Sequence, residues 1–230
     1  MEVKTEAGTR ERTGEIGIVV LAAGESARMG QPKQLLVYNG KTLLRHAVET
    51  ALTFQSSQSS QPTQIAQALP VVVVLGAHSK LIGPELEGLP VCIVENLDWR
   101  GGMGYSLRAG LRALLAAEPQ VAAALFLLCD QPHITPPLLQ LLEYTWRQGA
   151  VGAASQYETR RGVPAIFDAQ LFPELLALQG AEGARQLLAK YADVVVAIPF
   201  PQGAIDVDNP ADYAALISPP NMQISMKDLR

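Results

Sequence analysis

Residues 16–34 read IGIVVLAAGESARMGQPKQ. The stretch opens with a continuous apolar run, from Ile16 to Leu21, that is rich in β-branched residues. Such a run predicts a strand that is buried on both faces, as in parallel sheets. It ends at Ala22-Ala23-Gly24, where small side chains let the backbone approach a bulky group. The sequence therefore predicts a buried strand whose end is open to a ligand.

The loop behind this strand carries Ser26, Arg28, Gly30 and Lys33. Backbone N–H groups in such a loop can surround an anion, and Arg and Lys supply the charge that balances a polyphosphate. The loop differs from a P-loop because Gly30 is followed by Gln-Pro-Lys, and it lacks a Gly-x-Gly-x-x-Gly fingerprint. The pattern favours a phosphate-binding loop; an ordinary connection with two solvated cations is the alternative.

Composition indicates one globular domain. The chain has 230 residues, of which 48% are hydrophobic and 17% charged. A net charge of −4 argues against a nucleic-acid partner. The two cysteines, Cys92 and Cys129, lack metal-ligand spacing and predict reduced thiols in a cytoplasmic protein. No apolar run approaches the roughly 20 residues of a membrane-spanning helix, so no membrane partner is expected.

The ends of the chain differ in character from its middle. Residues 1–15 are polar with mixed charges and do not read as a signal peptide, so we expect a disordered tail there. A single domain is expected over 16–217, with a Gln/Ser-rich surface loop at 55–64 and a second tail at 218–230.

Strands and helices alternate along this domain. Strands are expected over 16–21, 70–75, 91–94, 121–128, 150–155, 162–167 and 193–198, and helices over 42–54, 106–115, 136–148, 171–178, 182–191 and 211–217. Ser106 is expected to cap the second helix, and Arg160 and Arg161 to lie in a solvated polar turn. Binding of an anionic pterin phosphate by these two arginines is the alternative. The alternation predicts a three-layer α/β/α sandwich with a mostly parallel, Rossmann-like sheet.

Ligands of such sheets bind beyond the carboxyl ends of the strands. Asp130 follows eight apolar residues and is well placed there to hold Mg²⁺, which usually takes one or two carboxylates plus phosphate oxygens. Asp206 and Asp208 are two residues apart and face the same side of an extended backbone. The alternatives are a turn at Asp130 and a helix cap at Asp208 or Asn209.

Several motifs resemble one known family. The order Leu-Ala-Ala-Gly-x-Ser-x-Arg-Met-Gly-x-Pro-Lys-Gln-Leu-Leu from Leu21 is similar to the signature loop of nucleotidyltransferases, and most closely to that of the molybdenum cofactor cytidylyltransferases. Their Cys-Asp-x-Pro and Asp-x-Asp-x-Pro-x-Asp-Tyr runs are matched at 129–132 and 206–213. Their Gly-x-Pro-x-x-Phe run is matched from Gly162, and their Trp-x-x-Gly-Met-x-x-Ser-Leu loop is approximated from Trp99. The resemblance covers about residues 16–217.

The resemblance implies a nucleotide-diphospho-sugar transferase type of fold and a set of site residues. The implied activity is transfer of CMP from CTP to the terminal phosphate of molybdopterin, with Arg28 and Lys33 as catalytic cations. The implied nucleotide-binding residues are Leu21, Ala22, Ala23, Gly24, Ser26, Arg28, Lys33, Gly102 and Ser106. The implied molybdopterin-binding residues are Gly162, Pro164, Phe167 and Arg185, and the implied ligands of Mg²⁺ or Mn²⁺ are Asp130, Asp206 and Asp208.

Nucleotide specificity and binding partners are inferred from fewer residues. In the families that it resembles, Leu-Ala-Ala-Gly goes with cytidine and Leu-Ala-Gly-Gly with guanosine, so Ala23 favours CTP. The other implied partners are molybdopterin, with or without molybdenum, and a recipient molybdoenzyme or its chaperone. One departure is visible at Gly180-Ala-Glu-Gly-Ala-Arg185, where the acidic residue of the family's Gly-Asp-x-Gly-Ala-Arg run is displaced by one position.

Two other readings stay open. The chain could be another nucleotidyltransferase, for guanylyl transfer to molybdopterin or for a sugar, polyol or lactate phosphate. It could also be a nucleotide-binding chaperone that delivers the cofactor.

Overall fold

The computed structural model describes residues 11–58, 69–180 and 183–218. Seven strands form one sheet in the order β5-β4-β1-β6-β8-β7-β9. In chain order they are β1 (Ile16–Ala22), β4 (Val71–Leu75), β5 (Val91–Glu95), β6 (Ala123–Leu128), β7 (Gly152–Tyr157), β8 (Arg160–Asp168) and β9 (Val195–Pro199). Neighbouring strands are parallel except at β8, which runs antiparallel to β6 and β7. The expected mostly parallel sheet is confirmed.

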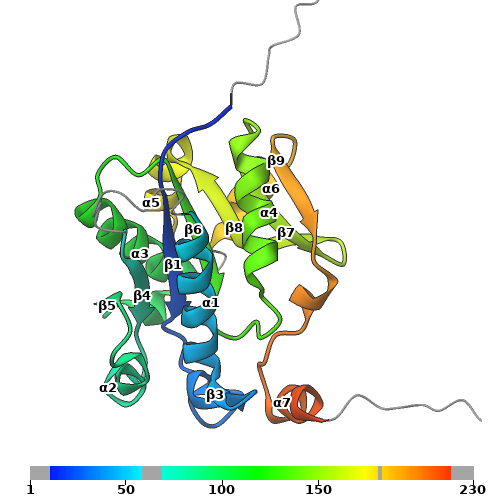
Figure 1. Ribbon diagram of the computed structural model, residues 1–230. Helices are drawn as coiled ribbons and strands as arrows, with labels where there is room; N and C mark the ends of the chain where they lie inside the picture. The colour runs from blue at the N-terminus through cyan, green and yellow to red at the C-terminus, as the bar shows by residue number, and fades with distance from the viewer. Residues whose placement is uncertain (1–10, 59–68, 181–182, 219–230) are drawn as a thin grey trace, which may run out of the picture.

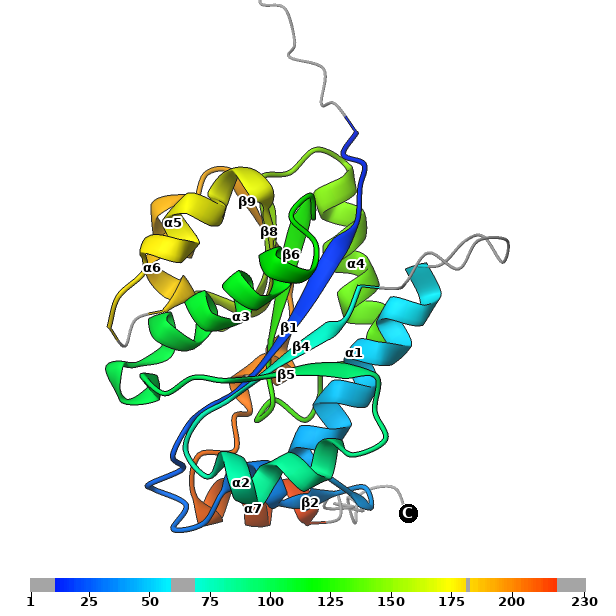
Figure 2. The ribbon, with the colours of Figure 1, turned by 90° about the vertical axis from the view of Figure 1, so that its left-hand side faces the viewer.

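Helices cover both faces of this sheet (Figures 1 and 2). On one face lie α1 (Leu43–Gln58) and α4 (Pro136–Arg147); on the other lie α3 (Met103–Ala117), α5 (Phe172–Ala177) and α6 (Ala184–Lys190). Each helical layer closes its own apolar core against the sheet. The three-layer α/β/α sandwich in a single domain is therefore confirmed.

Strand β1 lies near the middle of the sheet because its side chains are apolar on both faces. Ile18 and Val20 point into one core, while Val19 and Leu21 point into the other. The helix α3 packs unusually close to this strand, since a Cβ on Gly110 would lie 2.4 Å from a methyl of Val19. The strand is thus held from both sides, and its carboxyl end has a fixed position.

A smaller unit closes the bottom of the molecule in Figure 1. It combines the hairpin β2 (Val37–Tyr38) and β3 (Lys41–Thr42) with α7 (Pro210–Ile217), and α2 (Ser79–Ile82) lies near it in Figure 2. Val207 is fully buried in its core, and the Val207 N–H donates to the Asp130 carbonyl over 3.1 Å. Asn209 caps α7 in a capping box with Asp212. This unit carries the segment 206–208 to the end of β6.

Three local expectations are corrected. The helix α1 continues through residues 55–58, which we expected in the surface loop, because the Ser56 hydroxyl bonds back to the helix and Gln55 donates to Leu69. Arg160 and Arg161 belong to β8 and not to a turn. Ser106 lies inside α3, not at its cap, with its hydroxyl accepting a 3.0 Å hydrogen bond from Asn96.

The N-terminal boundary also differs from the expected one. Residues 11–15 lie against the domain, because the Arg12 guanidinium pairs with Asp168 at 2.5 Å and Ala122 N–H donates to Glu15 over 2.9 Å. The rest of that tail, residues 59–64 of the loop and residues 219–230 lie outside the described residues.

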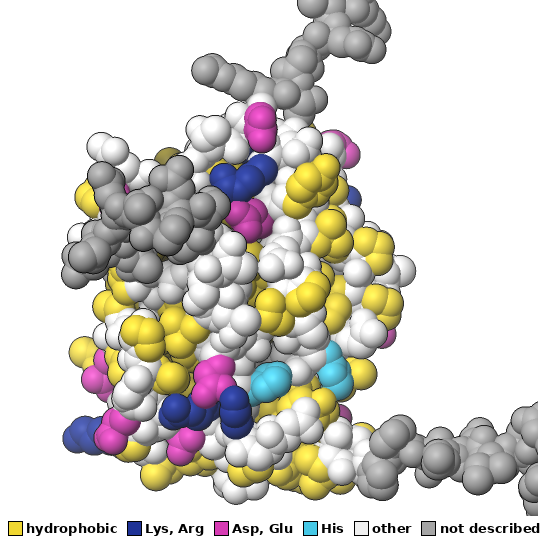
Figure 3. Space-filling view, in the orientation of Figure 1, with side chains coloured by type: hydrophobic (Ala, Val, Ile, Leu, Met, Phe, Trp, Pro, Cys, Tyr) yellow, Lys and Arg dark blue, Asp and Glu magenta, His cyan; other side chains and the backbone are white. Residues whose placement is uncertain are grey.

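The outer surface carries mixed charge on the face that α1 and α4 cover. Positive and negative side chains lie next to one another there in small groups between apolar areas (Figure 3). Within the described ranges, no helix has the length and apolar character that crossing a membrane requires.

Candidate active site

The loop after β1 takes its shape from a side chain that the sequence did not single out. The Gln34 amide is buried and donates hydrogen bonds to the carbonyls of Ala22 and Gly24, over 3.0 and 2.9 Å. The Ser26 hydroxyl accepts a 3.0 Å bond from the Lys33 N–H and contacts Gln34. The loop is therefore folded back on itself and rigidly placed before any ligand binds.

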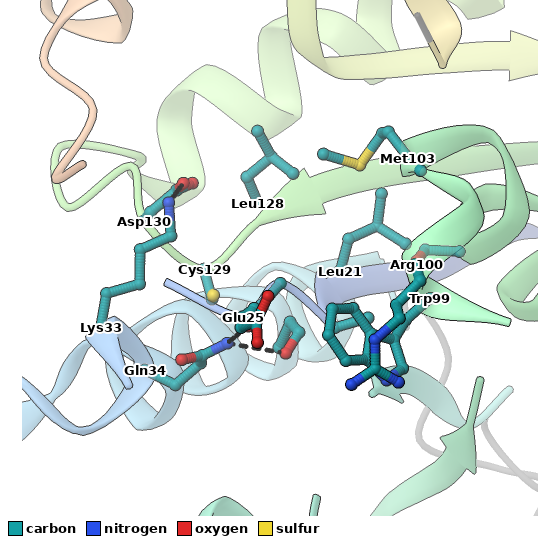
Figure 4. Close-up of a pocket in the computed structure, with 15 residues that line it drawn as sticks. Leu21, Glu25, Lys33, Gln34, Trp99, Arg100, Met103, Leu128, Cys129 and Asp130 are labelled. Atoms are coloured by element: carbon teal, nitrogen blue, oxygen red, sulfur yellow. Dashed lines mark hydrogen bonds and ion pairs between the residues drawn. The ribbon is translucent and has the colours of Figure 1, made fainter. Parts of the chain in front are cut away.

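A first cavity of about 300 Å³ opens between this loop and the start of α3. Small groups form one side, and a Cβ added to Gly24 would meet nothing within 4 Å, which leaves open space beside the backbone. On the other side the Arg100 guanidinium stacks over the Trp99 indole, 4.2 Å from its centroid (Figure 4). The cavity therefore joins an aromatic and cationic wall to a bare strip of backbone, a combination that suits a nucleotide.

Lys33 connects the loop to both acidic segments. Its ammonium group pairs with the Asp130 carboxylate and lies 2.9 Å from an oxygen of Asp208. Arg28 pairs with the same Asp208 carboxylate at 2.6 Å, although the Arg28 side chain is largely exposed. Residues that are more than 170 positions apart in the sequence thus meet in one ionic cluster, made of Arg28, Lys33, Asp130 and Asp208.

The charges in this ionic cluster support one another. Burial alone would lower the pKa of Lys33, but the carboxylates of Asp130 and Asp208 outweigh it and raise that pKa. Burial would also raise the pKa of Asp208, but Lys33 and Arg28 hold it below its usual range. The neighbouring Cys129 differs, because burial raises the pKa of its thiol to about 12 and keeps it neutral and unreactive.

A second cavity of about 210 Å³ adjoins the first. The two share Leu21, Met103 and Leu128 as lining residues, so they meet at the carboxyl ends of β1 and β6. The second cavity has an apolar floor, and its polar lining consists of Tyr157, Arg160, Arg161, Arg185 and Asp206.

Tyr157 shapes this second cavity. Its hydroxyl lies over Gly162, where an added Cβ would come within 2.0 Å of the hydroxyl oxygen. The absence of a Cβ at Gly162 therefore makes room for Tyr157.

Burial and the nearby Asp206 raise the pKa of Tyr157. In turn, burial and the carboxylates of Asp130 and Asp208 raise the pKa of Asp206 to about 6.

The ionic cluster fits a divalent cation in part. The carboxylates of Asp130 and Asp208 already share one positive group, the ammonium of Lys33. Oδ1 of Asp130 is buried and has no hydrogen-bond partner in the described structure. Among the described residues, however, no three His, Cys, Asp or Glu side chains gather into a metal-binding group. The expected set of three carboxylates is thus not assembled, and Asp206 lines the second cavity. Two protein carboxylates completed by phosphate oxygens are a usual set for Mg²⁺.

The structure separates the expected ligand-binding residues into those that line a cavity and those that do not. The first cavity is lined by Leu21, Ala22, Ala23, Gly24, Lys33, Gly102, Ser106 and Asp130. The second is lined by Gly162, Arg185 and Asp206. Ser26, Arg28 and Asp208 line neither cavity. Ser26 bonds to the loop, and Arg28 pairs with Asp208, which also contacts Lys33.

Two of the expected acceptor contacts are corrected. Phe167 is fully buried and packs edge-on against Phe126, with ring centroids 6.0 Å apart, so it supports the sheet and cannot touch a ligand. Pro164 is buried as well, and its carbonyl accepts a 2.9 Å bond from Ser155. Both follow Gly162 along a strand whose later residues pass between the two helical layers, which the motif alone did not reveal.

Sequence reasoning missed several lining residues. Gln34 and Glu25 lie in the signature loop, and Gln34 belongs to the Pro-Lys-Gln-Leu-Leu run that carries the family resemblance. Tyr157 comes from the hairpin of β7 and β8 and was not considered. Arg160 from the same hairpin was considered, but a polar pattern there is also expected of a solvated turn, which was favoured. No signal in the sequence distinguishes the two cases.

Comparisons with known proteins agree on the kind of domain. The sequence matches the family described as MobA-like NTP transferase domain over residues 18–194. It is 35% identical to nicotine blue oxidoreductase of Paenarthrobacter nicotinovorans over 178 residues, which cover 74% of this chain and 79% of that relative. It is 28% identical to purine catabolism protein PucB of Bacillus subtilis, covering 85% of this chain and 92% of PucB.

The structure is similar to that of Rv0371c from Mycobacterium tuberculosis, which was solved in complex with manganese. The TM-score is 0.68 at 25% sequence identity, and the match covers 88% of this chain and 97% of Rv0371c.

Proposed function

The chain belongs to the MobA-like NTP transferase family, and from this premise we propose that it transfers CMP from CTP to the terminal phosphate of molybdopterin. An oxygen of the acceptor phosphate attacks the α-phosphorus of CTP. The bond between the α-phosphorus and the bridging oxygen breaks, and pyrophosphate leaves. The products are molybdopterin cytosine dinucleotide and pyrophosphate.

One observation supports this proposal above the others. Two cavities adjoin at the carboxyl ends of β1 and β6, as a reaction between two bound molecules requires, and the ammonium group of Lys33 lies at the first of them. A phosphate monoester is already anionic near neutral pH and needs no general base. The barrier lies in bringing two anions together and in the charge that develops on pyrophosphate.

The residues of the ionic cluster then take distinct roles. Lys33 and Arg28 stabilise the negative charge of the triphosphate, while Ala22 to Gly24 lie against the nucleotide through their backbone. Asp130 and Asp208 would hold Mg²⁺ or Mn²⁺, which would neutralise charge on the reacting phosphates. Because their carboxylates contact Lys33, binding of the ligands must exchange that contact for a phosphate contact.

The choice of CTP rests on the wall formed by Ala23. A Cβ on Gly76 would lie 2.8 Å from the Cβ atoms of both Ala23 and Trp99, so this wall is closely packed. Ala23 lines the first cavity, and we infer that its methyl disfavours the larger purine there. A difference of one methyl group gives about 1–3 kcal/mol of discrimination.

The test is pyrophosphate release measured with each of the four NTPs, with Mg²⁺ or Mn²⁺, and with and without molybdopterin. Release that needs both CTP and molybdopterin supports the proposal. Release with GTP and molybdopterin, or with CTP and a sugar, polyol or lactate phosphate, contradicts the cytidylyl or the molybdopterin part. Binding of CTP without any turnover favours a chaperone that delivers the cofactor. Recognition of a recipient molybdoenzyme and a cytoplasmic location stay predictions.

The relative from Paenarthrobacter nicotinovorans points to a second candidate. It is named as an oxidoreductase, at 35% identity over most of its length. We therefore include an assay for reduction or oxidation of nicotine blue. Turnover there, together with no pyrophosphate release from any NTP, would replace the transferase proposal.

A further inference from the structure

The arginines of the second cavity are paired differently from the cations of the ionic cluster. Lys33 and Arg28 are both engaged by carboxylates. Among the described residues, neither Arg160 nor Arg185 forms an ion pair, and the Arg161 guanidinium donates to the Ala192 carbonyl at 2.5 Å, which leaves its charge uncompensated. Against these three positive charges the lining of the second cavity has one carboxylate, that of Asp206.

The positions of these arginines are set by neighbouring groups. Arg160 and Arg161 open β8, and Tyr157 from β7 lies over the adjacent Gly162. Arg185 comes from α6 on the other side of the cavity. Two elements thus bring guanidinium groups to one opening, and Leu107, Val163 and Leu188 supply apolar surface beneath them.

Guanidinium groups bind phosphate through paired, charge-assisted hydrogen bonds. A cavity lined by apolar side chains and by guanidinium groups fits a small molecule with a flat ring and a phosphate group. It does not fit a neutral acceptor, which would leave three like charges facing one another.

On the basis of the proposed function, we infer that Arg160 and Arg161 determine acceptor specificity, by binding the phosphate monoester of the acceptor in the second cavity. Arg185 completes the phosphate site from α6. The role extends the acceptor site beyond the residues that the sequence motif implied, to a hairpin where the sequence favoured a solvated turn over phosphate binding.

The test uses equilibrium binding of the full chain to two matched probes, neopterin monophosphate and unphosphorylated neopterin, by calorimetry. We expect the wild type to prefer the phosphorylated probe. Arg160→Ala should weaken its binding by roughly tenfold, as expected for one lost charge-assisted contact, and leave the binding of neopterin and CTP unchanged. Arg160 carries the test because its side chain is exposed and forms no hydrogen bond or ion pair within residues 11–58, 69–180 and 183–218, so its removal does not threaten the fold.

Two further variants sharpen the result. Arg160→Lys keeps the charge but not the paired geometry and should restore binding only in part. Arg112→Ala, an exposed arginine of α3, is the matched control and should behave as the wild type. Equal loss of both probes in Arg160→Ala, or no loss of the phosphorylated one in either Arg160→Ala or Arg161→Ala, would overturn the inference.

Glycerol phosphate separates this inference from the proposed function. Binding of glycerol phosphate that depends on Arg160, together with no pyrophosphate release from molybdopterin, would show that the arginines bind a phosphate group. Molybdopterin would then not be the acceptor. If molybdopterin turns over normally in Arg160→Ala and Arg161→Ala, with an unchanged acceptor KM, the proposed function stands and the inference fails.

Discussion

The two adjoining cavities handle charge in opposite ways. At the first, Lys33 is held by Asp130 and by Asp208 of the adjoining ionic cluster, so its charge is balanced within the protein. At the second, Arg160 and Arg185 have no carboxylate partner among the described residues. A ligand of the first cavity must displace contacts that already exist, whereas an anion entering the second meets uncompensated charge. The contrast predicts that substitutions at the two cavities change different kinetic constants.

Lys33→Ala should have the largest effect, because it removes the ammonium group that contacts both Asp130 and Asp208. We expect kcat/KM for pyrophosphate release to fall by roughly a hundredfold or more, because the variant loses a cation that meets developing negative charge. The assay uses CTP and molybdopterin at several concentrations. Lys80→Ala, an exposed lysine on α2, is the control and should keep the wild-type rate. A near-wild-type rate in Lys33→Ala would remove Lys33 from the mechanism.

Ala23→Gly should change only the first cavity. We expect the preference for CTP over GTP to fall by roughly tenfold, since a methyl group gives about 1–3 kcal/mol of discrimination. The measurement is the ratio of kcat/KM for the two nucleotides. Ala184→Gly removes a methyl from the lining of the second cavity and should leave that ratio unchanged. If Ala23→Gly does not alter the preference for CTP, a group other than the Ala23 methyl recognises the base.

Asp206→Asn tests the electrostatics of the second cavity through stability. Burial and the carboxylates of Asp130 and Asp208 raise the pKa of Asp206 from 3.8 to about 6, so the folded state holds a proton that the unfolded state has lost. The contribution of the protonated Asp206 carboxyl to the free energy of unfolding is complete below pH 3.8 and is lost as the pH rises to about 6. The wild type should therefore lose about 1–2 kcal/mol relative to Asp206→Asn across that window, a value reduced because the side chain is partly exposed.

This change is measured as the difference in the free energy of unfolding between the two proteins, by urea denaturation at pH 4 and at pH 7. Groups that titrate equally in both proteins cancel in the difference. A difference that stays constant between the two pH values would show that Asp206 has an ordinary pKa.

Gly162→Ala should have the smallest effect and confine it to the acceptor. The added Cβ would lie 2.0 Å from the Tyr157 hydroxyl oxygen, so the Tyr157 ring has to move. We expect the KM for the acceptor to rise by roughly threefold to tenfold while the KM for CTP stays the same. Gly83→Ala is the matched control, because a Cβ there meets nothing within 4 Å. An equal rise in both KM values would contradict the division between the cavities.

Much of the fold could be predicted because it depends on local patterns. The apolar runs of β1, β4 and β6 are buried on both faces, and the sequence reveals this directly. The antiparallel direction of β8 could not be predicted, since pairing between strands depends on contacts that no local pattern records. The end of α1 was missed for a related reason: a Gln/Ser-rich stretch is compatible with both helix and loop, and Gln55 is fixed by its bond to Leu69.

The candidate site shows the same division. The loop motif alone identified Gly24 and Lys33, because small residues and cations at a strand end have few other uses. The same reasoning overvalued Phe167, which the sheet buries, and undervalued Arg160, which the hairpin places at a cavity. A motif records which residues are present, while burial depends on what packs against them.

By itself, the sequence determined that this chain forms a buried parallel strand followed by a cationic loop, because apolar periodicity and small residues act over a few neighbouring positions. Only the tertiary structure decided that Lys33 meets Asp130 and Asp208, while the arginines of the hairpin meet no carboxylate in the part of the chain that the structure describes. Electrostatic interactions act between groups that are close in space, and the distance along the chain between Lys33 and Asp208 says nothing about that separation.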